Sequence, residues 1–405
     1  MALIVQKYGG TSLQNFECIR NVAQRIRDTY LQGHALIVVI SAQGGITDQL
    51  IRDAQKCSSL PDSREVDALL ATGEQACCCL VALALQDLKI SAISLSGEQA
   101  GIWTNELHRH ATIQNILPDR IGRHLEEKKV VLVAGCQGIS PQGDITTFGR
   151  GGSDLTAIAL AAYFHAERCE IFTDVDGIYA ADPRKVLLSE CLQQVSLDTM
   201  LAVSQNGGNV MHSRSVALAK EKNVNFHVRS SFSDIDKGTL ISSQSPSDWE
   251  PIHLSIKSNL RHLRFILSPT SLPQIYGEMH RLNTYGISID WFSERCLANG
   301  REEICVTFET ESEQHLQSLR ESILRHGGEL CMEGYLSRIS LIGALVKENR
   351  ALLLTKWSQA LNAAQISIVK ITANDIHVAL FVHASDTTKA TDILSQQLGL
   401  QNLQT

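Results

Sequence analysis

The feature that most constrains the fold of this chain is the alternation of apolar strands with amphipathic helices from Met1 to about Ser243. Alternation of this kind favours a sheet with substantial parallel pairing and helices on both faces. The sequence therefore predicts an α/β fold for residues 1–243. The best strand candidates are Ala35 to Ile40, Ile90 to Leu95, Val130 to Ala134 and Cys169 to Thr173.

The remainder of the chain contains a degenerate internal repeat. After a polar stretch at residues 244–251, which we interpret as a linker, two strand-helix-strand-strand-helix units follow at about residues 260–330 and 335–405. Their second strands are similar, since one contains Ile-Ser-Ile at residues 287–289 and the other at residues 366–368. A duplication of this kind predicts two small ferredoxin-like modules.

Bulk properties exclude several classes of protein. At 405 residues the chain is long for one core, so two or three domains are expected. The formal net charge is −7 and there is no block of like charges, so the sequence lacks the basic patch expected of a protein that binds nucleic acid. No leader and no apolar run of roughly 18 residues is found, which predicts a cytoplasmic protein without a membrane partner. The eleven cysteines are odd in number and lack C-x-x-C spacing, so we expect free thiols and no metal site.

The most informative local motif is Phe-Gly-Arg-Gly-Gly-Ser-Asp-Leu-Thr-Ala at residues 148–157. Three glycines around Arg150 leave room for backbone N–H groups to face an anion. Ser153 and Asp154 occupy the place expected of a helix N-cap, and an apolar run at helical spacing follows. A glycine loop at a helix N-terminus suits a phosphate or carboxylate, although a plain capped turn explains the motif equally well by itself.

Two further segments place charged residues after predicted strands. Residues 3–12 read as a strand, a lysine, a glycine pair and a Thr/Ser cap before a helix. Residues 170–179 place two aspartates and a tyrosine just past a buried strand, and residues 182–184 form a turn that ends in an arginine. Phosphoryl transfer needs a cation, glycine loops and strand-end aspartates, because its catalysis is mostly positioning and charge neutralisation.

Together these segments resemble the three signature segments of aspartate kinases, in the order expected of that family. The similarity covers essentially the whole chain. It implies an α/β amino-acid-kinase-type sandwich with helices on both faces of a mostly parallel central sheet, followed by two ferredoxin-like ACT modules. The residues that carry it are Lys7 to Ser12, Gly149 to Ala157 and Thr173 to Tyr179, with further matches at Ser41-Ala42, Thr47-Asp48, Thr72-Gly73-Glu74 and Val228 to Ser231.

The resemblance implies ATP-dependent phosphorylation of the side-chain carboxylate of L-aspartate, the first step toward lysine, threonine and methionine. It implies ATP with Mg²⁺ as the nucleotide, and a homodimer or higher homo-oligomer formed through the ACT region, residues 252–405. One ACT module is expected to borrow a strand from residues 252–256.

The same resemblance assigns roles within residues 1–243. Lys7 would neutralise charge on the transferring phosphoryl group, and Asp154 would orient Lys7. Arg150 would clamp the substrate α-carboxylate, and Glu74 would meet its ammonium group. The residues implied for aspartate binding are Ser41, Thr47, Glu74, Arg150 and Ser153. Those implied for the nucleotide are Gly9, Gly10, Thr173, Asp174, Tyr179, Arg184 and Asn209.

The chain departs from the family pattern at four places. Asn209 replaces a lysine that reaches the ATP phosphates, Cys136 replaces a phenylalanine beside the aspartate pocket, and Gln75 replaces an arginine. Both ACT modules lack the Pro-Gly pair after their first strand, at residues 268–271 and 347–350, where effectors bind in the family. Feedback by lysine or threonine is therefore not expected. Two alternatives stay open: a kinase for another small carboxylate, and a non-catalytic regulatory paralogue.

Overall fold

The computed structural model of the chain describes residues 2–183, 189–208, 210–233, 237–243, 253–284, 287–309, 313–343 and 345–398. The chain divides into two compact units. The first comprises Met1–Ala180 with Glu190–Pro251, and the second comprises Ala181–Ser189 with Ile252–Thr405. Ala181 groups with the second unit because it forms a parallel bridge with Leu254.

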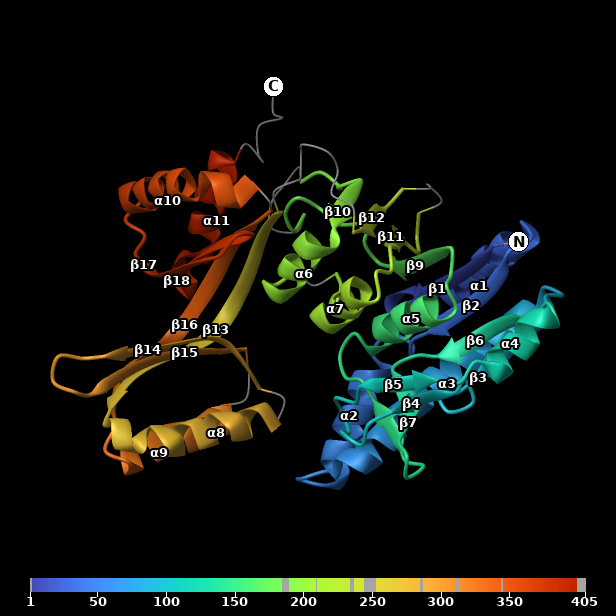
Figure 1. Cartoon of the computed structure of the whole chain (residues 1–405), viewed down its shortest axis with the longest axis horizontal. Coiled ribbons are helices and arrows are strands. Elements are labelled where there is room, and N and C mark those ends of the chain that lie inside the picture. The colour runs from blue at the N-terminus through green and yellow to red at the C-terminus, as the bar shows by residue number, and fades with distance from the viewer. Residues whose placement is uncertain are drawn as a thin grey trace. The chain divides into compact units, whose positions relative to one another are not determined.

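The first unit is built on an eight-stranded sheet with the order β10-β12-β11-β9-β1-β2-β6-β3 (Figure 1). Every neighbouring pair is parallel except β11 with β12. The mostly parallel sheet predicted from the sequence is thus confirmed. Its strands are β1 (Leu3–Tyr8), β2 (Ala35–Ile40), β3 (Ala92–Leu95), β6 (Val130–Ala134), β9 (Arg168–Thr173), β10 (Gln194–Ser196), β11 (Phe226–Ser230) and β12 (Thr239–Ser242).

Helices cover both faces of this sheet. Successive side chains of a strand point to opposite faces, so Ile4 and Val5 of β1 belong to two different apolar clusters. Helices α1 (Phe16–Leu31) and α3 (Ser63–Asp87) pack in the cluster of Ile4, and α2 (Ile46–Cys57) packs against α3. The cluster of Val5 contains side chains of α4 (Asp119–Glu126), α5 (Gly152–Tyr163), α6 (Leu197–Gln205) and α7 (Ser213–Glu221).

A smaller four-stranded sheet lies in the same unit, with the order β5-β4-β7-β8. Its last strand in sequence, β8, leads directly into the glycine loop that precedes α5. The sheet therefore positions the start of that loop. Its strands are β4 (Ile102–Thr104), β5 (Ile113–Ile116), β7 (Gln137–Ile139) and β8 (Ile145–Thr147).

Two helix starts differ from those predicted. Helix α1 begins after Asn15, whose side chain accepts a hydrogen bond from the N–H of Cys18, and Phe16 at its first position is 64% exposed. Helix α5 begins after Gly151, whose φ is 71°. Glycine adopts this left-handed conformation without steric cost. Ser153 and Asp154 therefore lie inside the first turn of α5, and neither side chain caps the helix.

Helix α3 is the one helix among the described residues that is long and apolar enough to cross a membrane by length and composition. The sequence expectation concerned uninterrupted apolar runs, and α3 is interrupted by polar and charged side chains such as Glu74 and Gln75. Half of its most apolar window is buried, and Val81 and Leu85 pack in the core beside α1. A core helix of a globular domain passes the same test, so the observation is weak support for a membrane span.

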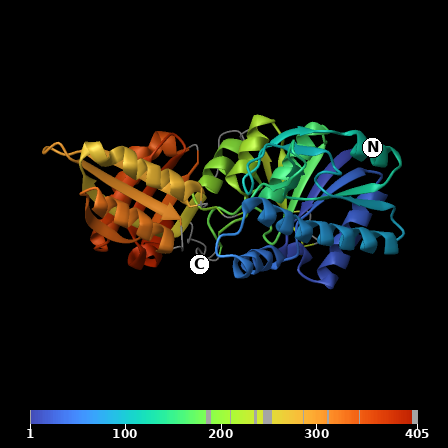
Figure 2. The ribbon, with the colours of Figure 1, turned by 90° about the horizontal axis from the view of Figure 1, so that it is seen from below.

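The second unit is a six-stranded antiparallel sheet with the order β14-β15-β13-β16-β18-β17. Its chain order is β13-α8-β14-β15-α9 followed by β16-α10-β17-β18-α11, which confirms the predicted duplication (Figures 1 and 2). Helices α8 and α9 share one apolar cluster, and α10 and α11 share another. The elements are β13 (His253–Leu267), α8 (Leu272–Thr284), β14 (Ser288–Cys296), β15 (Glu302–Glu309), α9 (Glu313–Arg325), β16 (Glu329–Ile342), α10 (Leu345–Ala363), β17 (Ile368–Ala373), β18 (His377–His383) and α11 (Thr387–Gln397).

Strand β13 serves both modules. Residues 261–267 pair with β15 of the first module, whereas residues 253–257 pair with residues 338–342 of β16 in the second. The pairing with β16 shifts register between Lys257 and Leu260, where the two parts meet. The strand expected at residues 252–256 is therefore continuous with the first strand of the first module.

Candidate active site

Three parallel strands bring predicted site residues to one edge of the large sheet. Lys7 of β1 pairs in register with Val39 of β2 and with Ile171 of β9. Ser41 follows the end of β2, where its N–H donates to the carbonyl of Tyr8 at 3.2 Å. The carboxyl ends of these strands are where ligands bind on sheets of this type.

Lys7 forms a buried ion pair with Asp154. Its Nζ lies 2.6 Å from Asp154 Oδ1, and the two side chains are only 11% and 9% exposed. Asp154 reaches Lys7 because it lies in the first turn of α5, which packs on β1. Lys7 is therefore not a solvated lysine at a strand end. A Cβ added to Gly9 would lie 3.4 Å from Nζ, so the ammonium group lies at the glycine turn.

Two glycines let backbone segments approach closely around this pair. A Cβ on Gly10 would lie 2.8 Å from the carbonyl oxygen of Ala42, in the segment that follows β2. A Cβ on Gly135, just past β6, would lie 2.5 Å from the hydroxyl of Ser153. The absence of a side chain at each position therefore brings the ends of β2 and β6 against the site.

The glycine loop around Arg150 is held from the side of α7. The guanidinium of Arg214 donates to the carbonyl oxygens of Phe148 and Ala111, each at 2.7 Å, and Ser215 Oγ donates to Gly151 O at 3.1 Å. Burial lowers the pKa of Arg214 from its ordinary value. Arg150 itself is exposed at the tip of the loop. The cation that faces solvent here is thus Arg150, while Arg214 stabilises the loop.

Glu74 lies on α3 and is 7% exposed. Burial raises the pKa of its carboxyl group to about 7, and backbone hydrogen bonds from Ala42 and from Glu74 itself oppose the shift. The contact with Ala42 places this carboxylate beside the residue after Ser41. An almost fully desolvated carboxylate at the strand ends is a site for a cationic group.

The remaining predicted site residues that the structure describes lie on α2 and in the segment that begins at the end of β9. Thr47 is half-buried in the first turn of α2. The hydroxyl of Thr173 donates to Asp174 Oδ1 at 3.1 Å, and Asp174 is exposed just past β9. The hydroxyl of Tyr179 points to Asp176 Oδ2 at 3.5 Å. Arg184 and Asn209 lie outside the described residues.

Cys136 and Gln75, two departures from the family pattern, both have defined partners. Cys136 has a φ of 62°, and its thiol donates to the carbonyl of Gly149 at 3.4 Å. Burial raises the pKa of this thiol to about 12, so it is neutral at physiological pH. Gln75 Nε2 donates to Gln137 Oε1 at 2.8 Å. The thiol of Cys136 therefore lies beneath the glycine loop.

The sequence interpretation missed Asp67, a fully buried carboxylate on α3. It accepts hydrogen bonds from Arg109 and Thr147, which come from two segments beside the glycine loop. A carboxylate among the apolar residues of a core-facing helix, seven residues before Glu74, was the available signal. In the described part of the chain, no group of three or more His, Cys, Asp or Glu side chains is arranged to hold a metal ion.

The chain is similar to known proteins over nearly its whole length. Residues 2–230 match the amino acid kinase family. The aspartokinase of Geobacillus stearothermophilus is 34% identical over 402 residues, which cover 99% of this chain and 98% of that protein. The chain belongs to the amino acid kinase family, in its aspartokinase branch. The aspartokinase of Mycobacterium tuberculosis is 37% identical over 413 residues, covering 99% and 97% of the two chains.

The fold also resembles that of a solved aspartokinase. The crystal structure of E. coli aspartokinase III in complex with aspartate and ADP superposes with a TM-score of 0.78 at 22% identity, covering 98% of this chain and 99% of that one. The two proteins therefore share the whole architecture, from the large parallel sheet to the paired ferredoxin-like modules.

Proposed function

We propose that this chain transfers the γ-phosphoryl group of ATP to the side-chain carboxylate of L-aspartate, which forms L-aspartyl 4-phosphate and ADP. The observation that carries the proposal is the buried Lys7–Asp154 pair between a glycine turn and the first turn of α5. Membership of the aspartokinase branch over nearly the full chain supports the choice of acceptor.

The reaction needs charge neutralisation more than a base. A free carboxylate has a pKa near 4 and is already ionised at neutral pH. One of its oxygens attacks the γ-phosphorus, the new O–P bond forms, and the bond from the γ-phosphorus to the bridging oxygen breaks. Negative charge spreads over the transferring group during this step. Lys7 supplies a preorganised positive charge there, with the backbone N–H of Gly10 beside it, and Asp154 fixes the direction of the ammonium group.

Aspartate binding is assigned to two oppositely charged groups. The planar guanidinium of Arg150 matches the substrate α-carboxylate in a two-pronged contact. The buried carboxylate of Glu74 pairs with the substrate ammonium group. The hydroxyls of Ser41, Thr47 and Ser153 provide further hydrogen bonds.

ATP binding is assigned to the segment after β9. Thr173 ends the strand that flanks Lys7, Asp174 follows it, and Tyr179 provides a ring for the adenine or ribose. Arg184 and Asn209 complete the proposed nucleotide set. Mg²⁺ keeps several waters and binds mainly phosphate oxygens, so it would enter with ATP, and the exposed carboxylate of Asp174 is a suitable oxygen ligand.

Residues 1–243 form the proposed catalytic part, and residues 252–405 the regulatory part with two ACT modules. We propose that the ACT region joins two copies of the chain. All eleven cysteines are free, which fits a reducing compartment such as the cytoplasm.

The test is ATP turnover with L-aspartate, compared with a panel of amino and dicarboxylic acids that includes L-glutamate. Hydroxylamine traps the acyl phosphate as a hydroxamate and so reports the product directly. We expect hydroxamate with L-aspartate and much less with every other acid. Turnover with another acid alone, or none with any acid, would overturn the proposal.

A further inference from the structure

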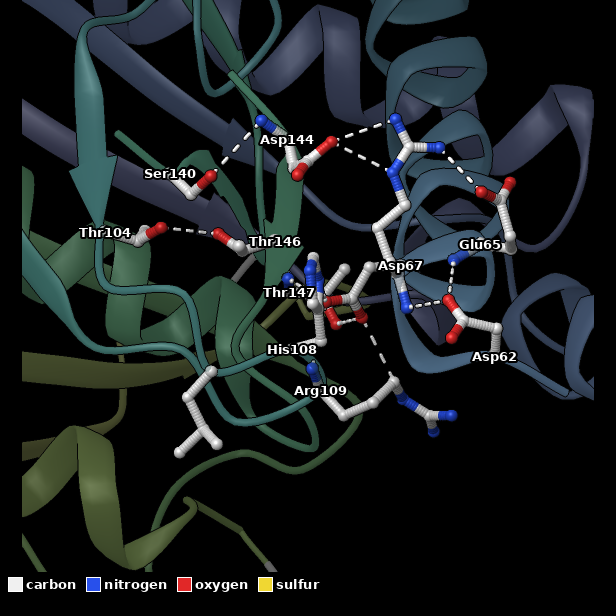
Figure 3. Close-up of polar contacts among 12 residues, drawn as sticks. Asp62, Glu65, Asp67, Thr104, His108, Arg109, Ser140, Asp144, Thr146 and Thr147 are labelled. Atoms are coloured by element: carbon white, nitrogen blue, oxygen red, sulfur yellow. Dashed lines mark hydrogen bonds and ion pairs between the residues drawn. The ribbon is translucent and has the colours of Figure 1, made fainter. Parts of the chain in front are cut away.

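Asp67 is a buried carboxylate that the proposed chemistry does not use. Its Oδ2 accepts hydrogen bonds from the backbone N–H of Arg109 at 2.9 Å and of Thr147 at 3.0 Å, and it lies 3.0 Å from His108 Nδ1 (Figure 3). Its Oδ1 accepts from the Thr147 hydroxyl. A fully buried carboxylate is tolerated only when such donors satisfy it. One side chain of α3 therefore holds two separate segments.

Both segments border the glycine loop. Thr147 ends β8 and is followed directly by Phe148, Gly149 and Arg150. The carbonyl oxygen of Arg109 would lie 2.8 Å from a Cβ on Gly149, so the second segment packs against the residue before Arg150. Asp67 thus fixes both the end of β8, which precedes the Arg150 loop, and the segment of Arg109, which lies beside that loop.

The backbone of Arg109 depends on this contact. Its φ is 68°, in the left-handed region that residues other than glycine seldom adopt. The N–H of Arg109 donates to Asp67 in this conformation. The hydrogen bond therefore offsets the steric cost of holding a non-glycine residue there.

The same helix carries Glu74, the proposed partner of the substrate ammonium. Asp67 and Glu74 are seven residues apart, which is about two helical turns, so both carboxylates lie on one side of α3. A link from Asp67 to the Arg150 loop is thus also a link between the groups assigned to the α-carboxylate and to the ammonium group of the amino acid.

We propose that Asp67 is a positioning residue for aspartate, which fixes the Arg150 loop at a set distance from Glu74 through Arg109 and Thr147. The inference rests on the proposed function, since it assigns Arg150 and Glu74 to the substrate. Loss of the Asp67 contacts loosens the loop while the nucleotide segment after β9 keeps its own support. Loss of these contacts should therefore weaken the binding of aspartate and leave the binding of ATP intact.

The test begins with Asp67→Asn, which keeps the shape but turns an NH₂ group toward donors. We expect the KM for aspartate to rise about tenfold to a hundredfold, the range for lost hydrogen bonds to a charged group. The KM for ATP should stay within about twofold, because no Asp67 partner belongs to the nucleotide segment. Thr147→Val, which removes one donor and keeps the carboxylate, should give a smaller change of the same kind if Asp67→Asn folds poorly.

The sharper readout is rescue. Glycine adopts a positive φ freely. Arg109→Gly in the Asp67→Asn background should therefore lower the KM for aspartate by about threefold or more relative to Asp67→Asn alone. Arg109→Gly alone should change the KM for aspartate by less than about twofold, because Asp67 still holds the backbone there. A residue that only stabilises the fold would show no recovery of this kind.

Asp144→Asn is the matched control. Asp144 lies between β7 and β8 and pairs with Arg64 of α3 at 2.9 Å, so it joins the same elements at a half-buried position (Figure 3). We expect both KM values to be unchanged. An equal rise in the two KM values of Asp67→Asn, an unchanged KM for aspartate, or no rescue by Arg109→Gly would each overturn the proposal. Calorimetric titration of the wild-type chain with aspartate separates the cases: no binding there means that the proposed function itself has failed.

Discussion

Lys7 and Asp154 show how burial changes the energetic contribution of an ion pair. Exposed pairs such as Lys56 with Asp53 contribute little, because water screens both charges. In the buried pair each charge needs the other, since removal of one leaves an uncompensated charge in a poorly solvated place. Lys7 is therefore held in one orientation before any substrate arrives.

We expect Lys7→Ala to lower kcat about a hundredfold to a thousandfold, the usual cost of removing one preorganised group from a charged transition state. Steady-state rates with saturating ATP and aspartate measure this. Lys56→Ala is the control, because it removes an ion-paired lysine from an exposed position. If the Lys7 variant kept more than about a tenth of the wild-type kcat, the role given to Lys7 would be wrong.

The raised pKa of Glu74 predicts that kcat/KM for aspartate depends on pH. Its pKa is raised to about 7 by burial, so the free enzyme gains the carboxylate charge as the pH rises through 7. We expect kcat/KM for aspartate to fall with decreasing pH below about 7, and the corresponding fall for ATP to be smaller. Glu74→Gln should bind aspartate weakly at every pH and lose the titration. A profile for that variant identical to the wild type would exclude Glu74.

The same shift has the opposite sign for stability. The folded chain holds this proton more tightly than the unfolded chain, so the contribution is present at low pH and is lost as the pH rises through about 7. The carboxylate to which we assign the substrate ammonium therefore destabilises the fold in the pH range where it is charged.

At the scale of elements, the site depends on how closely the glycine loop approaches α7. Gly151 has a φ of 71°, and a Cβ there would lie 2.2 Å from the Cβ of His212, the N-cap residue of α7. The N-terminus of α5, and with it Asp154, is therefore placed by contact with a helix more than fifty residues later in the sequence.

We expect Gly151→Ala to lower the free energy of unfolding by about 2–4 kcal/mol, because it combines an unfavourable φ with a clash. Gly143→Ala is the matched control: its φ is 84°, and a Cβ there would meet nothing within 4 Å. That variant should lose only about 1–2 kcal/mol, the cost of the backbone conformation alone. Denaturant titration gives both values. If the two variants lost the same free energy of unfolding, α7 would move away from the added Cβ at little cost.

At the scale of the whole molecule, the ACT region keeps the packing of its modules but not the family's effector loops. After β13, Ser268 is followed by a 3-10 helix at Pro269–Ser271, and residues 347–350 lie in the first turns of α10. The guanidinium of Arg350 donates to the carbonyl of Asn374 at 3.4 Å. Each module has an apolar cluster of strand and helix side chains, so the fold is retained where the loops differ.

We expect lysine and threonine, alone or together, to inhibit weakly or not at all. An effector shifts a two-state protein only by its different affinity for the two states, and the loops that bind it in the family have lost their Pro-Gly pair. Turnover at sub-saturating aspartate with millimolar lysine or threonine tests this. Inhibition below half of the activity would show that other groups bind the effector.

Several features of this protein were readable from the sequence alone. The order of strands and helices and the duplicated modules were predicted, because periodicity and local motifs depend on neighbours along the chain. The pairing of Lys7 with Asp154 was implied only by the resemblance to aspartate kinases, because the two residues lie far apart in the sequence. The resemblance to aspartate kinases added the class of reaction. Helix starts were less reliable: Asn15 and Gly151 cap α1 and α5, because loop geometry decides which residue takes the cap.

Other features were decided only by tertiary structure. Arg214 is a loop-holding residue because folding brings the carbonyls of Phe148 and Ala111 to its guanidinium. Asp67 gathers donors that are some 40 and 80 residues away in sequence. The raised pKa of Glu74 arises from burial by the elements around α3. Contacts and desolvation of this kind are sums over distant parts of the chain, so no local pattern in the sequence contains them.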